Sequence, residues 1–275
     1  MISAQPNKVA LVTGGASGIG LGITRRLARD GAAVGIVDVD PVALDQTVRQ
    51  FQGDGHVVHG VPADVGVTSD VERAIQEIKG ALGPVDVLVN NAGGWVIKPY
   101  LMATDEDFRR QMATNVYGTH LFMSRVLPGM IERGHGAIIN ISSVAALHYT
   151  VPHAVYAASK AAVIALTRDV AFEVAPFGVR VNSIAPGLIA VDKVLAQLNG
   201  DDDHLDERTD FHPVGWGRPE DIANVVAFLA SEEARFVIGT NLPVAGGSDL
   251  LVAMASAEVP ALLAPARTSV AGSAG

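Results

Sequence analysis

The chain has 275 residues, with 29 Asp or Glu, 20 Lys or Arg and no Cys, and its formal net charge is −9. The hydrophobic fraction of 49% and the charged fraction of 18% exclude an intrinsically disordered chain. The acidic balance excludes a general electrostatic attraction for nucleic acid or an anionic membrane. The lack of Cys excludes disulfides, thiolate catalysis and Cys-based metal sites.

Short β-branched runs alternate with longer segments of helical period along most of the chain. The alternation is typical of βαβ units, so it predicts an α/β fold with a doubly wound, seven-stranded parallel sheet flanked by helices. The predicted strands are residues 9–13, 33–38, 56–60, 85–90, 137–142, 179–185 and 241–244. The predicted helices are residues 18–30, 41–51, 68–81, 106–133 with a break near Pro128, 156–175, and 219–230.

Two segments depart from this alternation. Residues 187–217 form a polar, acidic stretch that is too long for an ordinary loop between a strand and a helix, and we expect either a lid over a substrate or a solvated insertion. Residues 251–275 are rich in Ala, Ser and Pro and predict a weakly ordered C-terminal tail. No internal linker divides the rest, so we expect a single domain over residues 1–250.

The first eight residues lack the basic segment and the apolar region of a signal peptide. No later apolar run reaches the 18 or so residues of a membrane span. We therefore expect a cytoplasmic protein that does not bind a membrane.

A glycine-rich segment, TGGASGIG, follows the first predicted strand and opens the first predicted helix. At that position the amides of the helix N-terminus can bind a phosphate. Gly14, Gly18 and Gly20 would allow positive φ, close approach of the backbone to a pyrophosphate, and tight packing of the helix on the sheet. The segment therefore predicts a dinucleotide site in a Rossmann-like fold, although an ordinary glycine-rich turn is the alternative.

Asp38 ends the second predicted strand, 18 residues after Gly20. A carboxylate there can accept hydrogen bonds from both hydroxyls of an adenosine ribose and would repel a 2′-phosphate. Neither Ser17 nor Val39 supplies a cation for that phosphate. The sequence therefore predicts NAD(H) rather than NADP(H), with a plain turn residue as the alternative for Asp38.

A tyrosine and a lysine, Tyr156 and Lys160, stand four residues apart on a predicted helix and so share one face. A nearby ammonium and an oxidised nicotinamide favour the phenolate, which brings the tyrosine pKa toward the working range of a general base. The fifth predicted strand ends in Ser142 and Ser143, whose hydroxyls lie at the ligand-binding edge of such a sheet. One serine could polarise a substrate carbonyl.

These motifs together resemble the short-chain dehydrogenase/reductase superfamily, and the resemblance runs from about Lys8 to Ser248. It implies that Tyr156 is the general acid/base, Lys160 lowers its pKa and binds the nicotinamide ribose, and Ser143 rather than Ser142 hydrogen-bonds the substrate oxygen. Asn115 would support a proton relay through water. The cofactor-binding residues that the motifs imply are Gly14, Ser17, Gly18, Ile19, Gly20, Asp38, Asp64, Val65, Asn91, Ala92, Gly93, Tyr156, Lys160, Pro186, Gly187 and Ile189.

One residue departs from the family pattern. Val191 stands where many members have a threonine that binds the nicotinamide carboxamide. Backbone groups of Ile189 or Val191 could replace it. The resemblance also implies a homo-oligomer, most often a tetramer, assembled through the helices at 106–133 and 156–175.

Trp95, His148, Tyr149 and His153 are expected by their positions to line the substrate space. Their aromatic, weakly polar character suits a neutral secondary alcohol or ketone, but packing roles are the alternative for each. No HExxH motif occurs among the eight His, and we expect no catalytic metal.

The favoured function is an NAD-dependent oxidoreductase that acts on a CH-OH group. One alternative is a 3-oxoacyl-thioester reductase of the same family, which Asp38 and the lack of a cation for NADP disfavour. The other is a regulator that binds NAD without turnover, which the intact set of Ser143, Tyr156 and Lys160 disfavours.

Overall fold

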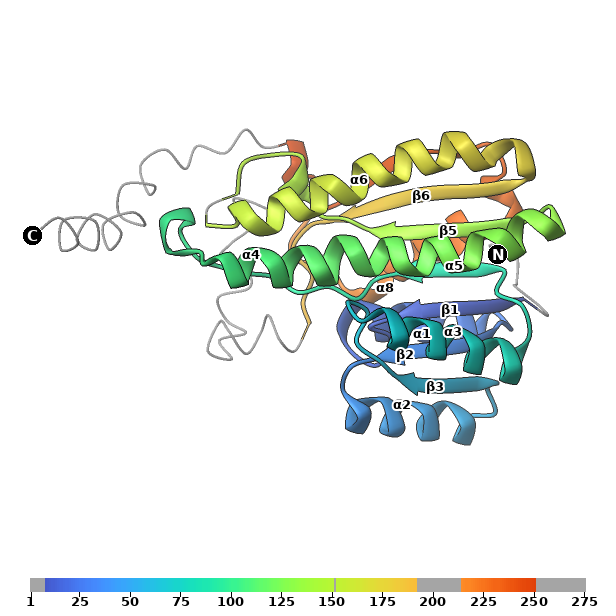
Figure 1. The fold of residues 1–275 in the computed structure, drawn as a ribbon. Coiled ribbons are helices and arrows are strands. Elements are labelled where there is room, and N and C mark those ends of the chain that lie inside the picture. The colour runs from blue at the N-terminus through green and yellow to red at the C-terminus, as the bar shows by residue number, and fades with distance from the viewer. Residues whose placement is uncertain (1–7, 151, 192–213, 251–275) are drawn as a thin grey trace, which may run out of the picture.

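The computed structural model describes residues 8–150, 152–191 and 214–250. The expected tail at 251–275 and most of the acidic stretch at 187–217 lie outside the described residues. Within them, seven parallel strands form one sheet in the order β3-β2-β1-β4-β5-β6-β7 (Figure 1). The strands are β1 Val9–Thr13, β2 Ala33–Asp38, β3 Val58–Pro62, β4 Val87–Asn90, β5 Gly136–Ile141, β6 Val179–Pro186 and β7 Asn241–Val244. The predicted doubly wound fold is confirmed.

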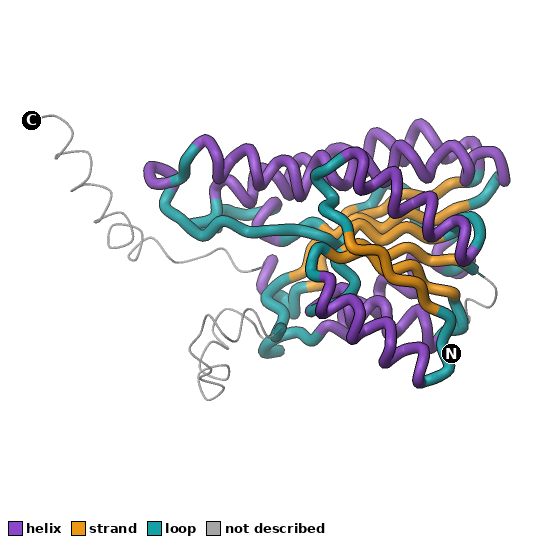
Figure 2. The backbone as a smooth tube through the Cα atoms, turned by 60° about the horizontal axis from the view of Figure 1, so that its bottom comes forward, coloured by secondary structure: helices purple, strands orange, loops and turns teal. Residues whose placement is uncertain are grey.

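Helices cover both faces of the sheet, which lies between them as the middle layer (Figure 2). On one face α1, α2 and α8 enclose one core cluster, with Ile23, Phe51 and Ile222 among its buried side chains. On the other face α3, α5 and α6 enclose a second cluster around Phe122 and Ile78. The bounds are α1 Gly18–Arg29, α2 Pro41–Gly53, α3 Thr68–Leu82, α4 Asp105–Met112, α5 Gly118–Arg133, α6 Ala154–Val174 and α8 Pro219–Ala230.

The long helix predicted over residues 106–133 is interrupted, but not at Pro128 as expected. A π-helical segment, Ala113–Tyr117, separates α4 from α5, and α5 runs through Pro128 without a break. Pro128 and Ser124, whose carbonyl loses its usual partner, both lie on the exposed side of α5. Water can therefore satisfy that carbonyl, and this explains why the proline is tolerated.

The third strand is displaced by two residues from its predicted position. The amide of His56 donates to Phe51 O and so belongs to the turn that leaves α2, while Val58 begins the pairing with β2. Pro62 ends the strand at the sheet edge, where a missing donor costs little. The other predicted strands and helices lie within two residues of the observed bounds.

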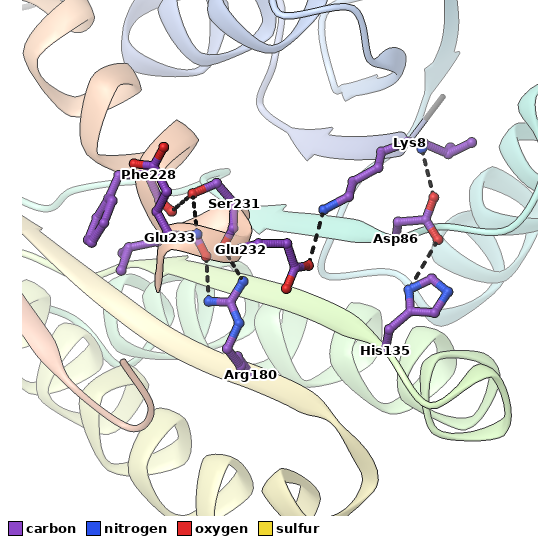
Figure 3. A network of polar contacts seen from close by, with 10 residues as sticks. Lys8, Asp86, His135, Arg180, Phe228, Ser231, Glu232 and Glu233 are labelled. Atoms are coloured by element: carbon purple, nitrogen blue, oxygen red, sulfur yellow. Dashed lines mark hydrogen bonds and ion pairs between the residues drawn. The ribbon is translucent and has the colours of Figure 1, made fainter. Parts of the chain in front are cut away.

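At the amino ends of the strands, charged side chains connect β1, β4, β6 and the end of α8 (Figure 3). Asp86 accepts from the Val9 amide at 2.9 Å, and Lys8 forms an ion pair with Glu232 at 3.8 Å. The Arg180 guanidinium donates to the carbonyl oxygens of Leu229 and Ser231. These contacts stabilise the amino ends of the strands, at the end of the sheet opposite their carboxyl ends.

Candidate active site

A cavity of about 660 Å³ lies at the carboxyl ends of the strands. Its lining extends from Asp38 at the end of β2, past Gly14 and Asn91 after β1 and β4, to Ser143 after β5 and Pro186 at the end of β6. The order of the strands reverses between β1 and β4. Doubly wound sheets bind their ligands at this position.

The glycine-rich segment forms one wall of the cavity. Gly14 and Gly18 have φ of 62° and 51°, in the left-handed region that favours glycine. No side chain caps the N-terminus of α1 and no acidic residue lies in its first turn, so its amides are available to an anion. These features fit the pyrophosphate of a dinucleotide.

Gly20 differs from the other cofactor residues named from the sequence, because it is not in the cavity lining. A Cβ at Gly20 would collide with the carbonyl oxygen of Gly14. Its place is therefore behind the loop, where it allows α1 to pack against the turn.

The loop after β4 is bound to the loop after β1. The Thr13 hydroxyl accepts from the amides of Asn91 and Ala92, both at 3.0 Å. The Asn91 side chain donates back to the carbonyls of Thr13 and Gly14. These contacts fix the two loops on either side of the switch point relative to each other.

Asp38 is buried, and both of its carboxylate oxygens accept backbone hydrogen bonds. Oδ2 accepts from Ala16 at 3.0 Å and Oδ1 from Asp40 at 3.1 Å. Each oxygen retains capacity for a further hydrogen bond from a ribose hydroxyl. Among the described residues that line the cavity, Lys160 is the only cation.

Ser143, Tyr156 and Lys160 lie together in the same cavity. Ser143 follows β5, and the other two side chains come from the first two turns of α6. The Ser143 hydroxyl is hydrogen-bonded to the Tyr156 side chain. Lys160 Nζ donates to Ile141 O at 2.7 Å and is 5.9 Å from the centre of the Tyr156 ring. Ser142, at the end of β5, donates to Ile184 O at 2.8 Å.

Burial shifts both titratable groups toward their neutral forms. It raises the pKa of Tyr156, and the hydrogen bond to Ser143 opposes this shift. It lowers the pKa of Lys160 from 10.5 to about 8. The ammonium form of Lys160 still predominates at pH 7, and it is the form that favours a phenolate.

Asn115 lies in the π-helical segment and is buried beside the cavity rather than in its lining. Its side-chain amide contacts the backbone of Gly94 and the hydroxyl of Ser159. The backbone carbonyl oxygen of Asn115 accepts from the Thr119 hydroxyl at 2.9 Å. Asn115 therefore connects the loop after β4 to α6.

The four residues expected to line the substrate space differ in their positions relative to the cavity. Trp95 lines the cavity, but His148, Tyr149 and His153 are not among the described lining residues. His153 instead precedes α6, with its ring 6.2 Å from that of Tyr156. Lining residues that sequence reasoning missed are Val39, Asp40, Ala63, Gly94, Thr114, Ile141 and Leu188; most adjoin a residue that was identified.

Val191, the residue that departs from the family pattern, lines the cavity. The β-bridge between Ile189 and Gly217 uses the carbonyl of Leu188 and the amide of Ala190, and leaves the backbone groups of Ile189 itself unused by the bridge.

No group of three or more acidic or His side chains that could hold a metal occurs within the described residues. No described helix is long and apolar enough to cross a membrane.

The fold and the site together define the class of α/β oxidoreductases that bind a dinucleotide at a switch point. A family model described as "Enoyl-(Acyl carrier protein) reductase" matches residues 14–249. The chain belongs to the short-chain dehydrogenase/reductase superfamily.

Particular relatives agree with this assignment. The chain is 38% identical to dehydrogenase/reductase SDR family member 4 of Sus scrofa, over 88% of this chain and 87% of that protein. It is 38% identical to 2-(S)-hydroxypropyl-CoM dehydrogenase 3 of Xanthobacter autotrophicus, over 90% of this chain and 98% of that protein. The structure of a gluconate 5-dehydrogenase from Burkholderia cenocepacia, in complex with NADP and tartrate, matches with a TM-score of 0.85 and 34% identity, over 91% of this chain and 98% of that one.

Proposed function

We propose that the protein is an NAD(H)-dependent oxidoreductase that interconverts a secondary alcohol and a ketone by hydride transfer. The observation that carries the proposal is the cavity itself, which has Ser143, Tyr156 and Lys160 on the β5 side and Asp38 on the β2 side. A bound nicotinamide cofactor would supply the hydride acceptor.

In this proposal Tyr156 is the general acid/base. During oxidation its phenolic oxygen takes the proton of the alcohol hydroxyl, the carbinol hydrogen leaves with its electron pair, and the C–O bond becomes a carbonyl. Ser143 holds the substrate oxygen by a hydrogen bond. Lys160 keeps a positive charge beside Tyr156 and donates to the nicotinamide ribose, while Asn115 supports the proton relay to water. The backbone of Ile189 would bind the carboxamide in place of the threonine that Val191 replaces.

The preference for NAD rests on Asp38. Its buried carboxylate would repel a 2′-phosphate, and no cation among the described lining residues lies on the β2 side to neutralise one. The Burkholderia gluconate 5-dehydrogenase was solved with NADP, so the fold alone does not set the preference. The carboxylate is the local feature that supports NAD in this chain.

We also propose that the chain forms a homotetramer through the α4 to α5 segment and α6. Large apolar side chains on these helices are exposed, with Phe172 on α6 at 85% and Phe108 on α4 at 48%. Such side chains are typical of an interface. Light scattering that gave the mass of a monomer would refute this assembly.

The experiment that tests the function combines NAD⁺ with a panel of secondary alcohols, including cyclic, steroidal, sugar-derived and 3-hydroxyacyl members, and follows the absorbance of NADH. Tyr156→Phe removes the proposed acid/base, and Tyr100→Phe is the matched control at an exposed tyrosine. Turnover by the wild type and by Tyr100→Phe, but not by Tyr156→Phe, is expected. Preference for the 3-hydroxyacyl member would favour the thioester reductase, and NADH binding without turnover of any member would favour the regulator.

A further inference from the structure

The peptide of Gly94 is held by amide side chains from the segment that joins α4 to α5. Its N–H donates to Asn115 Oδ1 at 3.0 Å, and its carbonyl accepts from Asn115 Nδ2 at 3.1 Å and from Gln111 Nε2. Gly94 immediately precedes Trp95, and both line the cavity. The wall of the proposed substrate space is therefore anchored through Asn115.

Asn115 is in turn held by a serine that no part of the proposed reaction uses. Ser159 is completely buried on α6, one residue before Lys160. Its hydroxyl accepts from Asn115 Nδ2 at 2.9 Å and donates to the carbonyl oxygen of Tyr156 at 2.7 Å. One continuous chain of hydrogen bonds thus connects Gly94, Asn115, Ser159 and the backbone of Tyr156.

The single hydroxyl proton of Ser159 determines which groups donate and which accept in this series of hydrogen bonds. A serine hydroxyl has one proton, and here it is donated to Tyr156 O, so toward Asn115 the hydroxyl can only accept. The nitrogen of the Asn115 amide must then face Ser159, and its oxygen must face the Gly94 N–H. An inverted amide would place two acceptors, Asn115 Oδ1 and Ser159 Oγ, against each other in a buried site, which is costly.

We infer that Ser159 is a positioning residue: it fixes the orientation of the Asn115 amide and thereby sets the position of the Gly94–Trp95 wall relative to Tyr156. The inference rests on the proposed function for its effect on catalysis. The hydrogen bonds join protein groups only, so the structural part of the inference can be measured separately from turnover.

Ser159→Ala tests the inference, because alanine is close in size and favours a helix. Ser124→Ala is the matched control, since it removes another helical hydroxyl, bonded to Leu121 O on α5, away from the cavity. Hydrogen exchange of the Gly94 amide in the cofactor-free protein is the first measurement. Ser159→Ala is expected to speed this exchange at least tenfold, and Ser124→Ala to leave it within twofold.

Steady-state kinetics on the best alcohol is the second measurement, with Ser159→Ala made in the wild type and in an Asn115→Ala background. We expect kcat to fall about tenfold in the wild type and less than twofold in the Asn115→Ala background, with NADH affinity within twofold throughout. Unchanged Gly94 exchange, or equal losses of kcat in both backgrounds, would overturn the inference. If the wild type turned over no alcohol, the proposed function would fail while the exchange measurement still decided the role of Ser159.

Discussion

Lys160 Nζ is 5.9 Å from the centre of the Tyr156 ring and donates to the carbonyl oxygen of Ile141 at 2.7 Å. Burial acts on the pair in opposite directions, since it raises the pKa of Tyr156 and lowers that of Lys160. Both shifts disfavour the charged pair that the proposed reaction needs. The positive charge of an oxidised nicotinamide would favour the phenolate, so we expect the cofactor to bind before the tyrosine can act as a base.

The lowered pKa of Lys160 predicts a pH-dependent stability. Between about pH 8 and 10.5 the unfolded chain keeps the lysine proton while the folded chain releases it, so stability rises with pH in that window. Lys160→Met removes this effect. The free energy of unfolding of the wild type relative to Lys160→Met is expected to rise by about 2 to 3 kcal/mol across the window, at roughly 1.4 kcal/mol per pKa unit.

Urea unfolding at a series of pH values measures this difference. Lys79→Met, which removes an exposed lysine from α3, is the control. A difference between the wild type and Lys160→Met that stays flat with pH would mean that Lys160 is not desolvated as described.

Asp38→Ser is expected to shift the cofactor preference toward NADPH by at least tenfold, because it removes the negative charge that a 2′-phosphate would meet. NADH should also bind more weakly, since the hydrogen bonds from Ala16 and Asp40 to the carboxylate are lost. Titration of both reduced cofactors by fluorescence measures the change. Asp45→Ser, at an exposed carboxylate on α2, is expected to leave both affinities unchanged. Tighter binding of NADPH than of NADH by the wild type would contradict the role of Asp38.

Two Gly→Ala substitutions distinguish two effects on the free energy of unfolding: tight packing at Gly20 and the backbone freedom of the unfolded chain at Gly53. Gly20→Ala places a methyl group against the Gly14 carbonyl, and we expect a loss of about 1 to 3 kcal/mol in the free energy of unfolding together with weaker NADH binding. Gly53→Ala, at the end of α2, meets no atom within 4 Å and is expected to stabilise by about 0.4 to 1 kcal/mol. Thermal unfolding compares the two, and equal effects would show that the glycine loop is not tightly packed.

The sequence predicted most of the fold because its signals are local. Buried strands read as short apolar runs, and the glycine segment carries its own conformational requirement at Gly14 and Gly18. The boundaries of β3 were wrong because the choice between the turn after α2 and the start of the strand depends on pairing with β2, which is not a local property.

Within the site, the sequence could identify residues but not their contacts. Nothing in the sequence pattern indicates the π-helical segment at Ala113–Tyr117, which places the Asn115 amide between Gly94 and Ser159. For the same reason the sequence does not indicate the contact between Ser159 and Asn115, although Ser159 precedes Lys160 on the same helix. The position of Tyr149 between Ser143 and Tyr156 predicts a place in the substrate space, but Tyr149 is 59% exposed and is not among the described residues that line the cavity.

Trp95 lines the cavity, whereas Tyr149 is not among its described lining residues. Trp95 lines the cavity next to Gly94, so Trp95→Ala would remove an apolar wall of the proposed substrate space. We expect KM for the best alcohol to rise at least tenfold, which corresponds to about 1.4 kcal/mol of lost binding, while NADH affinity stays within twofold. Tyr149→Ala is the matched aromatic control and is expected to change KM less than twofold. Steady-state kinetics with both variants measures these values. If Tyr149→Ala raised KM as much as Trp95→Ala did, the substrate would have to extend beyond the cavity toward the segment before α6; equal losses of NADH and alcohol binding in Trp95→Ala would instead place the indole against the cofactor.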